Sequence, residues 1–225
     1  MERLKRFAWL WVGLLFQKPC LACGQRVADP REAGLCPACW GALDRWPLPE
    51  VRAHLGEEPD FSPMAAFVYE GWLRELIHAW KFEGRSALTR PLARCMARRL
   101  RDQGADAFDF AVTLPANPAS LRERGFDAAG ELAALAARDL GLALLDPLQQ
   151  LRLRQRQSGL KHPERLKNAQ GLYALKPGQA VEGKRILILD DLMTTGATAQ
   201  AASAALLEAG ASSVGVGVLA HAVGA

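Results

Sequence analysis

The chain has 225 residues, 50% of them hydrophobic and 23% charged, which is typical of a globular protein and unlike disordered, collagen-like or membrane-spanning chains. Its 28 basic and 24 acidic residues leave a net charge of +4, too small to indicate a nucleic-acid-binding protein by itself. This length predicts one domain of moderate size, with or without a small additional unit.

The chain starts with three basic residues, Arg3, Lys5 and Arg6, followed by an apolar run over residues 7–16. The run resembles the start of a signal peptide, but no small-residue cleavage site follows it. It is also too short to cross a bilayer as a helix, which takes about 20 residues. We therefore expect a short amphipathic helix in a cytoplasmic protein with no integral membrane segment. Peripheral membrane contact is the less favoured alternative.

Four of the 5 cysteines form two pairs, Cys20 with Cys23 and Cys36 with Cys39, and 12 residues separate the pairs. Four thiolates can complete a tetrahedral Zn²⁺ site with no open position, which makes such a site structural and not catalytic. Two redox dithiols or simply buried thiols are the alternative, but two pairs in order favour zinc. Cys95 stands alone in a predicted helix, where we expect a core thiol.

Composition divides the chain into three predicted zones. Residues 1–46 hold the N-terminal helix and a zinc ribbon, and residues 47–63 form a linker rich in Pro, Glu and Asp. From residue 64 to residue 225, apolar strands alternate with amphipathic helices. That alternation predicts an α/β domain with a parallel sheet flanked by helices.

The elements of the third zone follow from periodicity and from the glycine and proline residues that interrupt it. Leu73, Ile77 and Trp80 share one face of a helix, and Gly141 and Gly210 end two later helices. The predicted helices cover residues 73–82, 88–100, 127–140 and 199–209. The predicted strands cover residues 65–69, 109–114, 185–189 and 214–219.

Residues 151–168 form a polar and strongly basic stretch with one acidic residue, Glu164. Such a run is usually a solvated surface loop. Its arginines and lysines could also neutralise a diphosphate leaving group or contact a nucleic-acid backbone. The two interpretations, a segment that contacts phosphate groups and a plain surface loop, have about equal support.

The most informative segment is residues 186–198. Asp190 and Asp191 follow an apolar strand, at the end where α/β sheets bind ligands. The next turn opens a helix, whose N–H groups and positive dipole end can bind a phosphate. Its residues are Thr194, Thr195, Gly196, Ala197 and Thr198. Acids beside a phosphate site suit a ligand that also carries hydroxyl groups or Mg²⁺, as a sugar phosphate does. The alternative is that the acids and threonines only cap the turn and the helix.

Residues 186–198 closely resemble the phosphoribosyl diphosphate-binding motif of type I phosphoribosyltransferases. Three further stretches resemble the ComF family: residues 69–84, residues 114–126 with Arg122-x-Arg124-Gly125-Phe126, and residues 157–171. Together with the paired cysteines, the resemblance covers nearly the whole chain. The family is described as a double zinc ribbon joined to a phosphoribosyltransferase domain, and it is associated with competence and DNA uptake.

The resemblance implies a type I phosphoribosyltransferase-like fold and a site for phosphoribosyl diphosphate with Mg²⁺. Asp190 and Asp191 would hold the ribose hydroxyls, residues 194–198 the 5′-phosphate, and Arg122 and Arg124 the diphosphate side. An active enzyme would transfer the phosphoribosyl group to a nitrogen acceptor. The alternative is a non-catalytic module that contacts single-stranded DNA or DNA-uptake proteins, or a phosphoribosyl diphosphate sensor.

Overall fold

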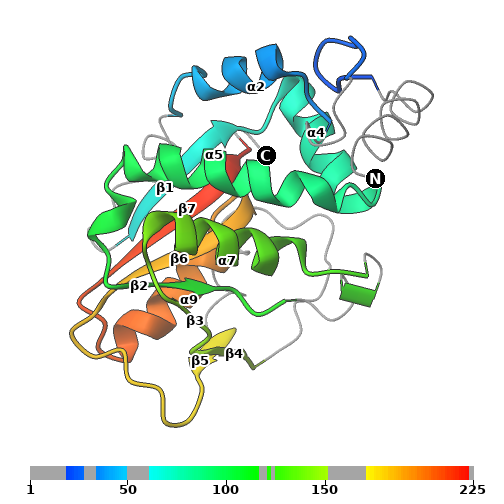
Figure 1. Ribbon diagram of the computed structural model, residues 1–225. Coiled ribbons are helices and arrows are strands. Elements are labelled where there is room, and N and C mark those ends of the chain that lie inside the picture. Colours follow the sequence, from blue (N-terminus) through cyan, green and yellow to red (C-terminus); the bar gives the residue numbers. More distant parts are fainter. Residues whose placement is uncertain are drawn as a thin grey trace, which may run out of the picture.

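The computed structural model describes residues 19–27, 34–49, 61–116, 121–122, 125–151 and 171–222. These residues build a five-stranded parallel sheet in the order β1-β7-β6-β2-β3, with helices on both faces (Figure 1). The predicted α/β fold class is therefore confirmed. The strands are β1 (Phe61–Val68), β2 (Phe110–Thr113), β3 (Leu144–Leu145), β6 (Arg185–Met193) and β7 (Ser213–His221).

Four helices cover the two faces of this sheet. One face packs against α4 (Gly71–Phe82), α5 (Thr89–Arg101) and α7 (Ala128–Leu140), and the other against α9 (Ala197–Glu208). Side chains alternate along β6, so that Leu187 and Leu189 pack on the first face, and Ile186 and Ile188 on the second. The 3₁₀ turns η2 (Ser86–Leu88) and η3 (Ala105–Ala107) flank α5.

The predicted elements of the sheet and its helices are found, but the strand before the acidic pair is longer than predicted. β6 continues to Met193, because β7 runs beside it as far as His221. The register pairs Asp190 with Val218 and Met193 with His221. Asp190 and Asp191 therefore lie in a strand, and the prediction of a loop from Asp190 onward was wrong.

Three short strands were not predicted: β3 at the edge of the main sheet, and two strands beside it. β4 (Leu148–Gln150) and β5 (Tyr173–Leu175) form an antiparallel pair beside the main sheet. They flank the basic stretch in the sequence, and residues 152–168 of that stretch lie outside the described residues. β1 begins at Phe61, within the predicted linker 47–63, and the division of the chain into domains stays a prediction.

The first described segments carry the paired cysteines and the helix α2 (Pro37–Asp44), and they pack on α4 and α5. Leu35 and Leu43 are fully buried in the same core as Trp80 of α4. The rings of Trp46 and Trp72 lie 5.4 Å apart, between centroids. The cysteine region thus shares one hydrophobic core with the sheet.

Arg99 joins the same two regions through hydrogen bonds. Its side chain is buried, and its Nε donates to the carbonyl of Ala66 in β1 over 2.6 Å. The guanidinium also donates to the carbonyls of Asp44 at 3.4 Å and Pro47 at 3.0 Å. One side chain of α5 therefore bonds both to the sheet and to the segment that follows α2.

Among the described residues, no helix combines the length and apolarity needed to cross a bilayer. The amphipathic helix predicted over residues 7–16 lies outside the described residues.

Candidate functional site

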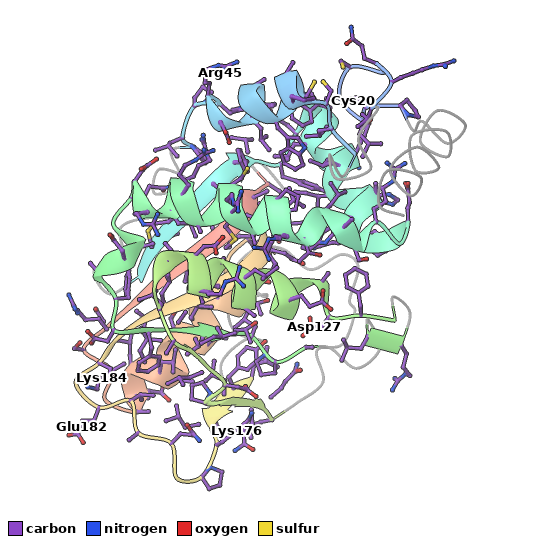
Figure 2. The ribbon with its side chains drawn as sticks, viewed as in Figure 1. Cys20, Arg45, Asp127, Lys176, Glu182 and Lys184 are labelled. Atoms are coloured by element: carbon purple, nitrogen blue, oxygen red, sulfur yellow. The ribbon has the colours of Figure 1, made fainter. Side chains whose placement is uncertain are left out.

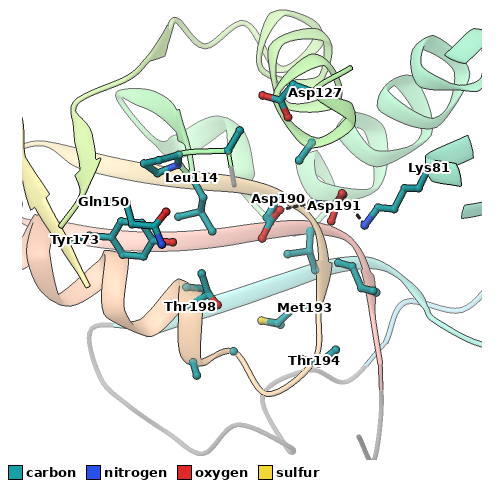
Figure 3. Close-up of a pocket in the computed structure, with 18 of the residues that line it drawn as sticks. Lys81, Leu114, Asp127, Gln150, Tyr173, Asp190, Asp191, Met193, Thr194 and Thr198 are labelled. Atoms are coloured by element: carbon teal, nitrogen blue, oxygen red, sulfur yellow. Dashed lines mark hydrogen bonds and ion pairs between the residues drawn. The ribbon is translucent and has the colours of Figure 1, made fainter. Parts of the chain in front are cut away.

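A cavity of about 330 Å³ opens at the carboxyl edge of the sheet, beside the ends of β2 and β6 and the starts of α7 and α9 (Figure 3). Parallel α/β sheets bind their ligands at this edge, and the volume is within the range of small-molecule sites. Polar side chains from several elements line the cavity: Lys81, Asp127, Gln150, Tyr173, Asp190, Asp191, Thr194, Thr195 and Thr198.

Asp190 and Asp191 occupy different environments, because adjacent residues of a strand point to opposite faces. Asp191 continues the alternation of Leu187 and Leu189, toward the layer of α4 and α7. Its side chain is buried, and its Oδ2 lies 2.7 Å from Nζ of Lys81. Asp190 is half-buried, and its Oδ1 accepts a hydrogen bond from the backbone N–H of Asp191 over 2.8 Å.

The electrostatics of the pair make Asp190 easier to protonate than an ordinary aspartate. Burial, reinforced by the neighbouring charge of Asp191, raises the pKa of Asp190 to about 7. The backbone hydrogen bond and Lys81 act in the opposite direction but do not outweigh these causes. Two carboxylates and one ammonium thus share the edge of the cavity, where ligand hydroxyl groups can be recognised.

The turn between β6 and α9 forms the opposite wall of the cavity. Gly196 is the N-cap of α9 with a φ of +72°, a conformation that side-chain-bearing residues rarely adopt. Thr194 is exposed, Thr195 is buried and Thr198 is half-buried. The N–H groups of the first helical turn have no acceptor within the helix and lie at its positive end. This turn can therefore bind a phosphate group.

The structure brings most of the predicted ligand-binding residues together. Asp190, Asp191 and residues 194–198 all line the one cavity. Arg122 is exposed and is not among the lining residues, although Leu121 and Phe126 on either side of it are. Arg124 lies outside the described residues. Their roles in ligand binding stay predictions.

Sequence reasoning missed four polar residues of the cavity wall. Lys81 lies four residues after the buried Ile77, so helical spacing places a charged residue on an apolar face. This charged residue on an apolar face was a sequence signal from which Lys81 could have been identified as a candidate site residue. Asp127 is the first residue of the predicted helix 127–140, and in the structure its Oδ1 caps α7 by accepting a hydrogen bond from the N–H of Gly130 over 3.0 Å. Gln150 and Tyr173 come from β4 and β5, whose approach no local pattern indicates.

A second candidate site is the four-cysteine cluster beside α2. The thiol sulfurs of Cys20, Cys23, Cys36 and Cys39 all lie within 4.8 Å of one another. Those of Cys23 and Cys36 are 3.8 Å apart. A tetrahedron with Zn–S bonds of about 2.3 Å has edges of about 3.8 Å, so the cluster fits a zinc ion.

Local structure explains how the two cysteine pairs converge. The first pair lies on a tight turn, where Gly24 has a φ of +73° and its N–H donates to the carbonyl of Cys20 over 2.9 Å. In the second pair, Cys36 is the N-cap of α2 and Cys39 lies in its first turn, after Pro37. The sequence predicted that the four cysteines form one cluster, but it did not predict this helix.

The cluster is also electrostatically incomplete without a cation. Burial opposes ionisation of Cys20, but hydrogen bonds from the backbone of Cys36, Cys23 and Ala22 outweigh it and lower its pKa to about 6. Burial and the other three sulfurs raise the pKa of Cys39. A bound metal ion would favour the deprotonated form of all four thiols together.

Cys95 is a separate, buried thiol in α5, as predicted. Its Sγ lies 3.5 Å from Oδ1 of Asp44. Burial, and then the charge of Asp44, raise its pKa to about 12. A thiol that stays protonated at neutral pH is unreactive, which agrees with a structural role.

Comparison with known proteins gives three findings. Residues 123–224 match the phosphoribosyl transferase domain family. The chain is 27% identical over 179 residues to competence protein ComFC of Streptococcus pneumoniae, covering 80% of this chain and 77% of that one. It is 28% identical over 202 residues to DNA utilization protein YhgH of Salmonella typhi, covering 88% and 87%.

One solved structure that resembles this chain is a hypoxanthine phosphoribosyltransferase from Staphylococcus aureus, with 12% sequence identity and a TM-score of 0.39. The match covers 59% of this chain and 64% of that one, just under two thirds of its length.

The domain match, the two curated relatives and the converging cysteines agree with the motifs read from the sequence. The chain is therefore similar to competence and DNA utilization proteins, and its four-cysteine cluster precedes a segment that matches the phosphoribosyl transferase domain family.

Proposed function

We propose that the cavity binds phosphoribosyl diphosphate together with Mg²⁺, and that the protein transfers the phosphoribosyl group to a nitrogen acceptor. The observation that carries this proposal is the convergence of Asp190, Asp191 and the turn 194–198 on one cavity. Carboxylates suit ribose hydroxyl groups, and the start of α9 suits the 5′-phosphate. The match to a phosphoribosyl transferase domain supports the same ligand.

In the proposed reaction, a nitrogen lone pair forms a bond to C1 of the ribose while the bond between C1 and the diphosphate oxygen breaks. The acceptor nitrogen releases its proton to solvent, and diphosphate leaves with the bonding electrons. Asp190 and Asp191 would orient the ribose, and the turn 194–198 would fix its phosphate, so that the chain contributes mainly by positioning. Mg²⁺ bound with the ligand would supply positive charge to the diphosphate oxygens.

The test compares the full, zinc-loaded chain with the double variant Asp190→Asn/Asp191→Asn. Calorimetric titration with phosphoribosyl diphosphate and Mg²⁺ should show binding to the wild type and at least a tenfold loss in the variant. The double variant Asp102→Asn/Asp106→Asn is the matched control, because it removes two exposed carboxylates that do not line the cavity. Unchanged affinity in the cavity variant would contradict the assignment of the acids.

Turnover separates an enzyme from a sensor. The proposed transfer releases one diphosphate per phosphoribosyl group, so a screen of nitrogenous bases and amines can monitor diphosphate. Binding without release for every acceptor would favour a protein that senses phosphoribosyl diphosphate and would contradict the transfer reaction.

We further propose that the protein acts in DNA uptake in the cytoplasm, with the four cysteines holding structural Zn²⁺. The relatives named as competence and DNA utilization proteins support a role in DNA uptake. The five cysteines, all described and all free of disulfides, suit a reducing compartment.

Contact with single-stranded DNA would appear as oligonucleotide binding that weakens steeply with salt. Binding that is absent or insensitive to salt would contradict such contact.

A further inference from the structure

Lys81 supplies the one Lys or Arg side chain among the described residues that line the cavity, beside three carboxylates, those of Asp127, Asp190 and Asp191. Its side chain is only 10% exposed, and its Nζ lies 2.7 Å from Oδ2 of Asp191. Burial of an ammonium group costs free energy unless the group is paired. The ion pair with Asp191 offsets this cost and holds a cation at the edge of the ligand cavity.

The fold separates Lys81 from the phosphate-binding turn. Lys81 belongs to α4, on the sheet face covered by α4, α5 and α7, whereas the turn 194–198 opens α9 on the other face. Asp190 and Asp191 lie between them at the edge of the sheet (Figure 3). A ligand that reaches both Lys81 and the turn must therefore extend across this edge.

Phosphoribosyl diphosphate has this form, because it carries one phosphate at C5 and a diphosphate at C1 of the ribose. In a pose with the 5′-phosphate at the turn and the ribose hydroxyls at the acids, the C1 end of the ligand would extend toward Lys81 of α4. We propose that Lys81 contacts the diphosphate group, and that Asp191 holds Lys81 at the cavity before the ligand arrives. This inference rests on the proposed function.

The charges of the site support this role. Three carboxylates alone would repel a polyanionic ligand, and Lys81 places a positive charge among them. An ammonium group has three N–H donors, and the bond to Asp191 uses one of them, so Lys81 can hold Asp191 and a phosphate oxygen together. As the diphosphate leaves, its growing negative charge would face a cation that is already in place.

The experiment measures the binding of three ligands, each with Mg²⁺, to the full zinc-loaded chain by calorimetry. The ligands are phosphoribosyl diphosphate, inorganic diphosphate and ribose 5-phosphate, which lacks the diphosphate. The variants are Lys81→Gln, Lys81→Arg, Asp191→Asn and the double variant Lys81→Gln/Asp191→Asn. Lys176→Gln is the matched control, because Lys176 forms an exposed ion pair with Asp146 and does not line the cavity.

Lys81→Gln should weaken the binding of phosphoribosyl diphosphate and of inorganic diphosphate by about tenfold or more, the size of one lost charge-assisted contact. Its affinity for ribose 5-phosphate should stay within about threefold of wild type. Lys81→Arg should recover most of the loss, since the charge is kept. Asp191→Asn should show the opposite pattern, with diphosphate binding kept or improved and ribose 5-phosphate binding weakened.

The double variant leaves no unpaired charge from this pair, so it tests the assignment if Lys81→Gln alone fails to fold. It should lose affinity for inorganic diphosphate to the same degree as Lys81→Gln. An equal loss for all three ligands in Lys81→Gln would mean that Lys81 only positions Asp191, and that result would overturn the inference. So would unchanged diphosphate binding. A wild type that binds none of the three ligands would instead overturn the proposed function itself.

Discussion

The four-cysteine cluster and the cavity both gather groups of like charge, but they resolve the repulsion differently. The four sulfurs converge within 4.8 Å, which leaves room for a metal ion and no open position. The acids of the cavity border about 330 Å³ of space, and one lysine balances them only in part. A closed cluster of metal-binding side chains can stabilise a fold, whereas an open cavity whose charges are only partly balanced is suited to a ligand.

The two regions lie apart and gain stability from different sources. Cys20 lies beside α2, while Asp127 lies at the start of α7 on the other side of α5 (Figure 2). The cysteine region has few buried apolar residues of its own and depends on its contacts with α4 and α5. The acids of the cavity stand on β6, which pairs with β2 and β7. Loss of metal should therefore damage the first region far more than loss of an acid damages the second.

The largest effect should follow removal of a cluster cysteine. Cys36→Ser removes both a metal ligand and a buried sulfur at the start of α2. Metal binding supplies most of the folding free energy of small cysteine-rich units, so we expect a loss of several kcal/mol in the free energy of unfolding. Bound zinc, measured by atomic absorption, should fall from about one ion per chain to near zero.

Cys95→Ser is the control for this change, because Cys95 is also buried but lies outside the cluster. It should keep the zinc content and lose much less stability. Equal zinc contents in the two variants would contradict the assignment of the metal ligands.

The next largest effect should come from Arg99, which joins the segment after α2 to strand β1 of the sheet. Arg99→Met keeps the packing of the side chain but leaves the buried carbonyl of Ala66 and that of Pro47 without their donor. We expect a loss of about 3 kcal/mol in the free energy of unfolding, measured with urea. Arg94→Met, on the exposed side of the same helix, should change stability by less than about 0.5 kcal/mol. Equal effects would show that the docking contact contributes nothing.

A smaller effect, of opposite sign, is expected at Asp190. Its pKa is raised to about 7 by burial and by Asp191, so the folded state binds a proton more tightly than the unfolded state. Stability should therefore fall as pH rises from about 4 to 7. Asp190→Asn removes this dependence and should be more stable than wild type at pH 8, by on the order of 1 kcal/mol.

Thermal unfolding of Asp190→Asn and wild type at pH 4, 6 and 8 measures this difference, which should vanish at pH 4. The exposed Asp106→Asn should give no gain at any of the three pH values. A constant difference across the series would contradict the raised pKa.

The smallest effect concerns Asp127, which belongs to the cavity wall and caps α7. Asp127→Ala should lose about 1 kcal/mol of stability, whereas Asp127→Asn should lose almost none because its amide oxygen can still accept from Gly130. Urea unfolding distinguishes the two variants. Similar losses in both would mean that the carboxylate charge, and not the cap, stabilises this helix.

The sequence predicted those parts of the molecule that local patterns determine. The apolar run before Asp190, and the Thr-Gly-Ala-Thr turn after it, place strand, acids and helix start in order. The spacing of the cysteines alone predicts that the four thiols converge, and the structure brings them together. Helix α2 was missed because it has only 8 residues and includes Cys39, so its period is barely visible.

Other features depend on contacts distant in the sequence. β6 extends to Met193 because β7 pairs with it, and no residue within β6 indicates where the partner ends. Gln150 and Tyr173 reach the cavity from the ends of a long connection. The ion pair between Lys81 and Asp191 joins residues 110 positions apart. A local sequence pattern can mark a residue as unusual, as with the charged Lys81 on an apolar helix face. It does not show which distant residue that side chain will contact.

The most direct test of the central claim is a crystal structure of the full chain with phosphoribosyl diphosphate and Mg²⁺. We predict the 5′-phosphate at the turn 194–198, the ribose hydroxyls at Asp190 and Asp191, and the diphosphate within hydrogen-bonding distance of Nζ of Lys81. A ligand bound outside the cavity, or with its diphosphate in the turn 194–198, would contradict the account.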